Sequence, residues 1–270
     1  MSRLEQLQVL NGVLLAEMPE YRAQGERFPR EEGEQRRLLR SLMNLRPPIP
    51  LDPDFLAAQD ALLSAETAEK GVVDGDALVP TQADPRLVLW QGDITRLRAD
   101  AIVNAANSAL LGCFHPCHGC IDNAIHSAAG LQLREECFRL MEAQGHPEPN
   151  GRAKLTGGYN LPARHVLHTV GPIVRGRVTQ RDREELASCY RACLELAAER
   201  GLHSVAFCCI STGEFHFPNR EAAQIAVDTV RECLRQKTSI RRVIFNVFKD
   251  LDAEIYRGLL GPDRGAETGP

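Results

Sequence analysis

Residues 101–126 read AIVNAANSALLGCFHPCHGCIDNAIH and join an apolar strand to a dense run of polar and sulfur side chains. The apolar start leads into two amides, Asn104 and Asn107. The segment 113–120 then holds three of the nine cysteines and two of the eight histidines of the chain, a density that packing alone does not explain. Amides, potential metal ligands and the carboxylate of Asp122 together predict a polar site that begins where a strand ends.

Strands and helices alternate on either side of this stretch. Short apolar runs predict further strands at 87–92, 165–168, 204–210 and 242–248, and apolar residues at helical spacing predict helices at 122–143, 181–200, 219–236 and 250–260. Alternation of this kind indicates the α/β class, with a sheet covered by helices on both faces. In such a sheet, ligands bind at the carboxyl ends of the strands.

The segment that follows each predicted strand contains glycine or small polar residues. These segments are 92–94, 104–107, 169–172 and 211–216. Glycine lets backbone N–H groups approach a ligand closely, and consecutive N–H groups ahead of a helix bind a phosphate or pyrophosphate. We therefore expect the four loops to meet at one edge of the sheet and to bind a small anionic ligand.

Residues 1–75 show helical periodicity only, without the short apolar runs that predict strands. Leucines and methionines at helical spacing predict helices at 4–18 and 31–45, and a third at 52–69. The second helix should end at Arg46, because the residue before a proline is disfavoured in the helical region. We expect a helical extension at 1–75, the main domain at 76–261, and a disordered Gly/Pro-rich tail at 262–270.

Composition excludes several classes of protein. The net charge of −4 does not provide the positive electrostatic potential that nucleic-acid binding needs. The sequence contains no run of about 18 apolar residues, so no membrane span is predicted. The N-terminal MSRLEQLQVL lacks the apolar region of a signal peptide, so we expect a cytoplasmic protein. An odd number of cysteines, several in apolar runs, argues against a disulfide framework and makes the clustered cysteines candidate metal ligands.

Six motifs, taken in their order along residues 88–250, resemble those of one family. They are Gly92-Asp93-Ile94-Thr95, Ala101-Ile102-Val103-Asn104-Ala105-Ala106-Asn107, Lys154-Leu155-Thr156-Gly157-Gly158-Tyr159, Leu161-Pro162-Ala163, His168-Thr169-Val170-Gly171-Pro172 and Ile210-Ser211-Thr212-Gly213. The sequence resembles a macrodomain, the module that binds ADP-ribose, and within that family the MacroD type, which hydrolyses ADP-ribosyl esters. The resemblance implies a three-layer α/β/α fold around a central mixed sheet.

The chain departs from the MacroD type in one loop. Where that type has a glycine-rich loop ending in a Val-Asp pair, this chain has the Cys/His segment between Gly112 and Asp122. That segment resembles the zinc-containing microbial macrodomains, whose helical N-terminal extension is also similar to residues 1–75. The resemblance implies one Zn²⁺ per chain, held by Cys113, His118 and Cys120.

Coordination chemistry is compatible with two kinds of zinc site here. Three Cys and His ligands leave a fourth tetrahedral position for water or substrate, which is the catalytic arrangement. The alternative uses Cys117 and Cys120 as a C-x-x-C pair with Cys113, and becomes a closed structural site if His118 or His115 joins. The match of residues 116–120 to half of a zinc-deaminase signature is set aside, because His115 is the first histidine and no upstream H-x-E exists.

The resemblance also assigns the nucleotide-binding residues. Asp93 is expected to accept a hydrogen bond from the adenine amino group, the Ile94 amide to contact the ring edge, and Phe248 to stack on adenine. The pyrophosphate is expected to lie against the backbone N–H groups of one loop, made of Ser211, Thr212, Gly213, Glu214 and Phe215. The plainer interpretations are a turn-forming Asp93 and a core Phe248, and His216 stands where many macrodomains have glycine.

Three residues are assigned to catalysis. Asn104 and Asn107 are expected to face the distal ribose, and Asp122 aligns with the catalytic aspartate of the MacroD type, where it would orient or deprotonate a water. A zinc ion there would act as a Lewis acid. Asp122 is also a candidate N-cap for a helix that begins near Asn123. His126 is expected to be a packed core histidine.

These expectations define a function. The chain is expected to be a zinc-dependent hydrolase that removes mono-ADP-ribose from Asp and Glu side chains of proteins. The resemblance further implies a partner system in which a sirtuin-like transferase modifies a lipoylated carrier protein. The alternatives are a non-catalytic ADP-ribose reader with a structural zinc, and an O-acetyl-ADP-ribose deacetylase, which shares the pocket and differs in the leaving group.

Overall fold

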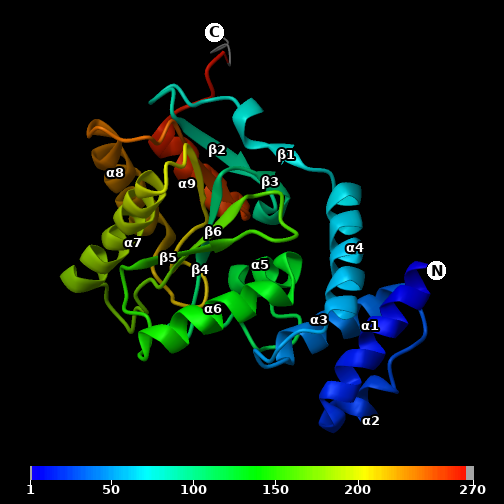
Figure 1. Ribbon diagram of the computed structural model, residues 1–270. Helices are drawn as coiled ribbons and strands as arrows, with labels where there is room; N and C mark the ends of the chain where they lie inside the picture. Colours follow the sequence, from blue (N-terminus) through cyan, green and yellow to red (C-terminus); the bar gives the residue numbers. More distant parts are fainter. Residues whose placement is uncertain (1, 266–270) are drawn as a thin grey trace.

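The computed structural model describes residues 2–265, and a six-stranded mixed sheet forms its centre (Figure 1). The order across the sheet is β2-β8-β7-β4-β6-β5, and every neighbouring pair is parallel except β5 and β6. The strands are β2 (Leu87–Gln91), β4 (Ala101–Ala105), β5 (Ala153–Gly157), β6 (His165–Thr169), β7 (Ser204–Phe207) and β8 (Arg242–Val247). The predicted α/β class and mixed sheet are confirmed.

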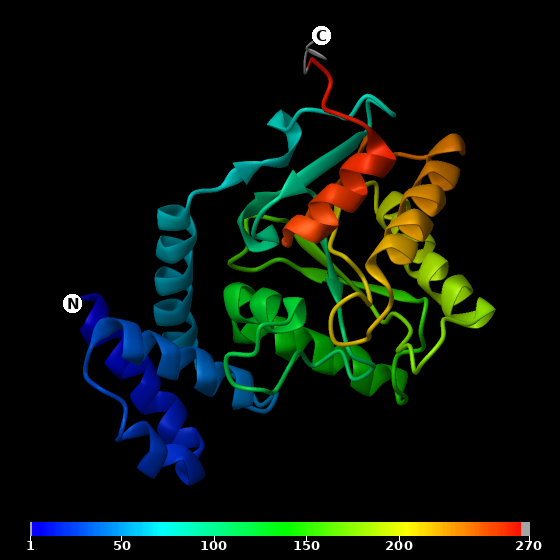
Figure 2. The same ribbon diagram turned by 180° about the vertical axis from the view of Figure 1, so that it is seen from behind.

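Helices cover both faces of this sheet. Helices α7 (Gln180–Glu199), α8 (Asn219–Arg235) and α9 (Asp250–Leu260) pack side by side on one face, and α5 (Ile121–Ala129) and α6 (Leu131–Gln144) pack on the other (Figures 1 and 2). Strands β4, β7 and β8 are almost wholly buried between the two layers, which explains why they read as continuous apolar runs.

One expectation about these elements was wrong, and one strand was not predicted. The helix predicted at 122–143 is divided at Gly130, which adopts φ +101. A Cβ there would lie 2.7 Å from Gln59 Nε2, and Gln59 Oε1 accepts from the Leu131 N–H at the start of α6. Strand β5 was not predicted, because it is an edge strand whose side chains are mostly half-buried and lack the apolar run of the central strands.

Helices α1 (Arg3–Glu17), α3 (Glu32–Leu45) and α4 (Pro53–Lys70) form where the periodicity predicted them. The 3₁₀ turn η1 (Pro19–Tyr21) and the short helix α2 (Arg22–Gly25) between α1 and α3 were not predicted. The leucines of α1, α3 and α4 make a second core, which Leu131 of α6 joins, so that α3 and α4 lie against α5 (Figure 2). The division of the chain at residue 75 stays a prediction.

Short elements complete the fold. Strands β1 (Val73–Asp74) and β3 (Leu97–Arg98) form a separate two-stranded parallel pair, and the 3₁₀ turns η2 (Gly75–Ala77) and η3 (Ile94–Arg96) lie next to these strands in the sequence. Of the tail expected at 262–270, Asp263 pairs with Thr81 in an isolated bridge, and residues 266–270 lie outside the described residues. Within 2–265, no helix is long and apolar enough to cross a membrane.

Candidate active site

A cavity of about 670 Å³ lies at the carboxyl ends of the parallel strands. Its walls come from the segments that follow β2, β4, β7 and β8, together with the Cys/His loop and the first turn of α5. Gly171, from the segment after β6, also lines the cavity, so the four predicted loops meet at one edge of the sheet. A volume of this size is typical of a site for a small molecule or cofactor.

One end of the cavity carries the residues expected to bind adenine. Asp93 lines the cavity. Its Oδ1 also accepts hydrogen bonds from Thr95 N (3.0 Å) and Thr95 Oγ1 (2.7 Å), so Asp93 both closes a turn and contributes to the wall. Ile94 lines the same wall. The Phe248 side chain is 76% exposed at the rim, so the interpretation as a core residue was wrong. Asn246, which the sequence did not single out, joins this end and donates to Gly92 O (2.9 Å).

The loop at 211–215 forms another wall. Two non-glycine residues of this turn, Ser211 (φ 64) and His216 (φ 57), have left-handed backbone, so His216 takes the conformation that glycine usually supplies. Gly171 packs against the loop so closely that a Cβ would lie 2.1 Å from Ser211 Oγ. That hydroxyl is buried and has no hydrogen-bond partner among the described residues.

Asp122 is held by two amides at the opposite end. Asn104 Nδ2 donates to Asp122 Oδ1 (2.7 Å), and Asn107 Nδ2 donates to Oδ2 (3.3 Å). Burial raises the pKa of the Asp122 carboxyl to about 6, although the Asn104 hydrogen bond and the positive charge of Arg134 oppose the shift. A carboxylate with a pKa near neutrality suits proton transfer at physiological pH.

The two asparagines do not share one environment. Asn107 lines the cavity, as expected, whereas Asn104 is fully buried behind Asp122 and does not line it. The prediction that Asn104 faces the ribose was therefore wrong in its placement. Asn104 sits on β4, where both faces of the strand are covered, and its amide also contacts His168 Nδ1 (3.2 Å).

The N-cap of α5 is Cys120 and not Asp122. The helix begins at Ile121, and Cys120 Sγ accepts from the backbone N–H of Asn123 (3.4 Å). Asp122 lies one residue into the helix and points its carboxylate at the two asparagines. The capping interpretation was wrong because the helix starts earlier than its composition predicted.

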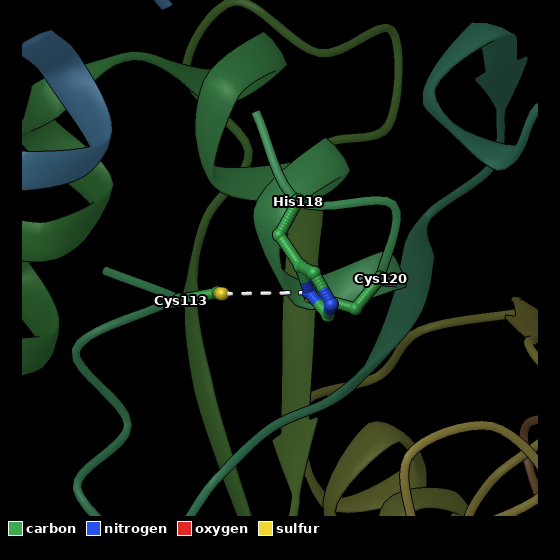
Figure 3. Close-up of side chains that lie close together, drawn as sticks. All are labelled: Cys113, His118 and Cys120. Carbon is green, nitrogen blue, oxygen red and sulfur yellow. Dashed lines mark hydrogen bonds between the residues drawn. The ribbon is translucent and has the colours of Figure 1, made fainter. Parts of the chain in front are cut away.

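Cys113, His118 and Cys120 place one donor atom each within 4.8 Å of one another, and Figure 3 shows the Cys113 and His118 side chains facing each other with Cys120 beside the imidazole. Cys113 Sγ lies 3.7 Å from His118 Nδ1. Tetrahedral zinc with Zn–S of about 2.3 Å and Zn–N of about 2.1 Å separates these donors by about 3.6 Å. The donor set and its spacing fit zinc.

The surroundings of the three donors agree with a cation. Burial, with Cys113 alongside, raises the pKa of Cys120 to about 12, so a pair of thiolates here requires a positive partner. His118 Nε2 lies 3.7 Å from Glu214 Oε1, beyond hydrogen-bond distance, so the Glu214 carboxylate of the 211–215 loop lies near the Cys/His loop without a direct hydrogen bond to His118.

The closed C-x-x-C alternative does not assemble. Cys117 Sγ points away from the other donors, to Ser41 Oγ (3.3 Å) and the carbonyl oxygen of Arg37 (3.6 Å) on α3. His115 lines the cavity, but its ring centroid is 5.9 Å from that of His118 and it is outside the donor cluster. Among the described residues of this loop, the donors that lie within 4.8 Å of one another are those of the open set.

A second group of potential ligands lies in the core beneath Asp122 and consists of His126, Cys137 and His168. Both ring nitrogens of His168 have hydrogen-bond partners, Asn104 at 3.2 Å and Thr156 Oγ1 at 2.9 Å. His126 is packed, as expected, but neither of its nitrogens has a hydrogen-bond partner among the described residues.

Sequence reasoning missed one buried cation beside the loop. Arg134 of α6 is 3% exposed, its guanidinium lies 4.3 Å from the centroid of the Phe114 ring, and its Nε donates to Leu111 O (2.7 Å). Burial lowers the pKa of Arg134 to about 10, so it stays charged at neutral pH. Its helical spacing carried no signal, because an arginine on an amphipathic helix is ordinarily exposed.

The fold and the cavity define an α/β protein with a nucleotide-sized site at the strand ends. The macro domain family matches residues 103–226. A protein-ADP-ribose hydrolase of Treponema medium is 49% identical over 249 residues, which cover 92% of this chain and 95% of that protein. A probable bifunctional ADP-ribose hydrolase/ADP-ribosyltransferase of Fusarium oxysporum f. sp. cubense is 45% identical over 86% of this chain and 42% of its own length.

Solved structures agree. The crystal structure of a Trypanosoma brucei macrodomain in complex with ADP-ribose superimposes with a TM-score of 0.64 at 32% identity, covering 82% of this chain and 95% of that one. The chain belongs to the macrodomain family. The extent of the likeness to curated hydrolases confirms the prediction that it is an enzyme.

Proposed function

We propose that this protein is a zinc-dependent hydrolase that removes mono-ADP-ribose from Asp and Glu side chains of proteins. The observation that carries the proposal is the juxtaposition of Asp122 with the Cys113/His118/Cys120 donors on one cavity wall. A carboxylate that can move a proton and a site for a Lewis acid are the two components that hydrolysis of an ADP-ribosyl ester needs.

The shape of the cavity supports ADP-ribose as the ligand. Asp93 and Phe248 follow the neighbouring strands β2 and β8, the 211–215 loop follows β7 next to them, and Asn107 follows β4 on the far side of β7, with Asp122 hydrogen-bonded to it. In this spatial order, the aromatic rim suits adenine, the backbone amides suit the pyrophosphate, and the polar end suits the distal ribose. The related trypanosomal macrodomain was solved in complex with ADP-ribose.

The residues of the chain divide the work of hydrolysis. Asp122 orients a water and takes its proton as the water oxygen bonds to C1″ of the distal ribose and the bond from C1″ to the side-chain carboxylate oxygen breaks; Asn104 and Asn107 fix the Asp122 carboxylate for that step. Zinc, when bound, supplies a Lewis acid and lowers the pKa of a water towards about 7. Cleavage leaves ADP-ribose and the restored side-chain carboxylate.

The test is release of ADP-ribose from an Asp/Glu-linked ADP-ribosyl protein, with metal-replete and chelator-stripped enzyme side by side. Replete enzyme should release ADP-ribose, and stripped enzyme should regain activity on addition of zinc. No release by replete enzyme refutes the substrate assignment. Full release by stripped enzyme removes zinc from the chemistry. Replacing the substrate with O-acetyl-ADP-ribose measures the preference for the leaving group.

Alanine variants identify the ligands. Zinc content and hydrolysis should fall together in Cys113→Ala, His118→Ala and Cys120→Ala, because each removes one of three donors. Cys117→Ala should keep its zinc, since its thiol points to α3. Loss of zinc with hydrolysis retained would instead indicate a metal that only stabilises the loop.

We further propose that a transferase supplies the substrate. The Fusarium relative is named as a hydrolase and an ADP-ribosyltransferase in one chain, which supports a pairing of the two activities. That the transferase is sirtuin-like and that its target is a lipoylated carrier stay predictions from the resemblance. The test is hydrolysis assayed on carrier protein that a transferase has modified, compared with the same protein unmodified.

A further inference from the structure

Helix α3 of the N-terminal extension contacts the Cys/His loop through side chains that the proposed reaction does not use. We infer that Arg40 and Asn44 are positioning residues that set the conformation of the metal-binding loop 113–120, so that the extension is a part of the site. The expected effect on zinc binding rests on the proposed zinc function. The positioning of the loop rests on the following contacts.

Arg40 joins the loop to the helix that carries Asp122. Its Nη2 donates to the carbonyl oxygen of His118 (3.2 Å), one of the expected ligands, and to Asn123 Oδ1 (2.7 Å), which also receives Arg40 Nε (3.1 Å). Asn123 is fully buried and its own Nδ2 donates to the carbonyl oxygen of His115 (2.9 Å). The Arg40 guanidinium therefore ties His118 to the first turn of α5, and Asn123, which it holds, ties His115 to the same turn.

Asn44 holds the loop at its most strained point. Pro116 and Cys117 form the centre of a turn closed by His118 N to His115 O (3.2 Å), and Cys117 has φ 53, a conformation that β-carbon residues seldom adopt. The Cys117 N–H donates to Asn44 Oδ1 (2.9 Å), and Asn44 Nδ2 donates to Ser127 of α5 (3.0 Å). Asn44 thus stabilises a turn that places His118 toward Cys113.

The partners of Arg40 distinguish it from the other arginines of α3. Among the described residues, Arg36 pairs with Glu66 and Arg37 with Glu34, whereas Arg40 donates only to the neutral oxygens of His118 and Asn123. A guanidinium forms planar, multiple hydrogen bonds that a lysine cannot reproduce at two acceptors. Arg40 is suited to fix geometry, and its removal should affect the loop more than the extension.

Arg36 supplies a matched control. It lies one turn before Arg40 on the same helix and donates to Glu66 of α4 (Nη2 to Oε2, 2.9 Å), so it joins two helices of the extension without contacting the loop. Arg40→Met and Arg36→Met each remove one guanidinium from α3 and keep the apolar part of the side chain. Arg40→Lys keeps the charge and loses the bridging geometry.

The experiment measures zinc affinity of the full-length chain by competition with a fluorescent chelator, alongside the thermal midpoint and amide hydrogen exchange of residues 113–120 in metal-free protein. Loss of a contact that orients a ligand typically lowers metal affinity by about 10- to 100-fold. We expect that decrease, with faster exchange of the loop, for Arg40→Met and Asn44→Ala. Arg40→Lys should lie between wild type and Arg40→Met, and Arg36→Met should bind zinc as wild type does.

Two results would overturn the inference. Wild-type zinc affinity and wild-type loop exchange in Arg40→Met would show that α3 does not position the loop. A decrease in affinity that follows the thermal midpoint equally in Arg40→Met and Arg36→Met would show a general loss of stability. If the wild-type chain binds no zinc, the zinc part of the proposed function fails, and the exchange measurement alone still decides whether Arg40 and Asn44 hold the loop.

Discussion

Replacement of Asn104 by alanine separates catalysis from binding. Asn104 is fully buried, contributes the shortest hydrogen bond to Asp122, and has no surface on the cavity. Asn104→Ala should therefore slow hydrolysis while the affinity for ADP-ribose stays close to that of wild type. Asn107→Ala should affect both, because Asn107 also lines the cavity.

The size of the effect follows from the hydrogen bond. A buried hydrogen bond to a charged group contributes about 1.5–3 kcal/mol. If the bond acts on the ionised, oriented form of Asp122, its loss lowers kcat/KM by about 10- to 150-fold, at 1.36 kcal/mol per factor of ten. The cost to folding is smaller, because Asn104 Oδ1 is itself buried without a partner among the described residues, and alanine removes that unpaired atom.

The assay combines single-turnover hydrolysis with calorimetric titration of ADP-ribose. Thr156→Val is the matched control, since it removes a buried hydrogen bond on the other side of His168 (2.9 Å) and leaves both donors of Asp122 in place. The control should retain the wild-type rate. Equal losses of rate and affinity in Asn104→Ala, or an unchanged rate in a folded variant, would refute the positioning role.

Three further predictions concern the rim, the loop and the core. Phe248→Ala should weaken ADP-ribose binding by about 1–3 kcal/mol, the range for stacking of a base on an aromatic ring. The thermal midpoint should stay unchanged because the ring is exposed. Titration calorimetry measures the affinity for ADP-ribose, and an unchanged affinity would place adenine elsewhere. Cys117→Gly should keep wild-type zinc content and match or exceed wild-type stability, because glycine adopts φ 53 without strain; loss of zinc would make Cys117 a ligand. Burial lowers the pKa of His168 to about 3, below its unfolded value of about 6.5, so between these two pH values the native state binds fewer protons than the unfolded state. The unfolding free energy should therefore fall as the pH drops below about 6.5, by up to about 1.4 kcal/mol per pH unit. Denaturant titrations of His168→Gln should show a smaller dependence on pH.

Much of the site was predictable because its signals are local. Glycines and amides that directly follow apolar strands predict loops at the strand ends, and parallel pairing then brings those loops to one edge without further information. Each of these inferences needs only a few consecutive residues. The same holds for the leucine periodicity of α1, α3 and α4.

Other features depended on contacts between distant residues. Both Asn104 and Asn107 read as polar residues after a strand, and only the closure of helices over β4 places the first behind Asp122 and the second on the cavity. The starting residue of α5, which decided against Asp122 as a cap, depends on where the loop ahead of it is held. The spacing of residues along the sequence predicts neither the placement of the two asparagines nor the first residue of α5.

The sequence by itself determined the α/β class, the order of the ligand-binding loops and the supply of cysteine and histidine donors, since these follow from periodicity and from residue types at strand ends. The tertiary structure decided which donors face one another. Cys113, His118 and Cys120 converge while Cys117 turns to α3, because Asn44 and Arg40 hold the loop from a helix about 80 residues away along the chain. Hydrogen bonds over that separation depend on how α3 packs against the loop and α5, so no local pattern could have chosen among the cysteines.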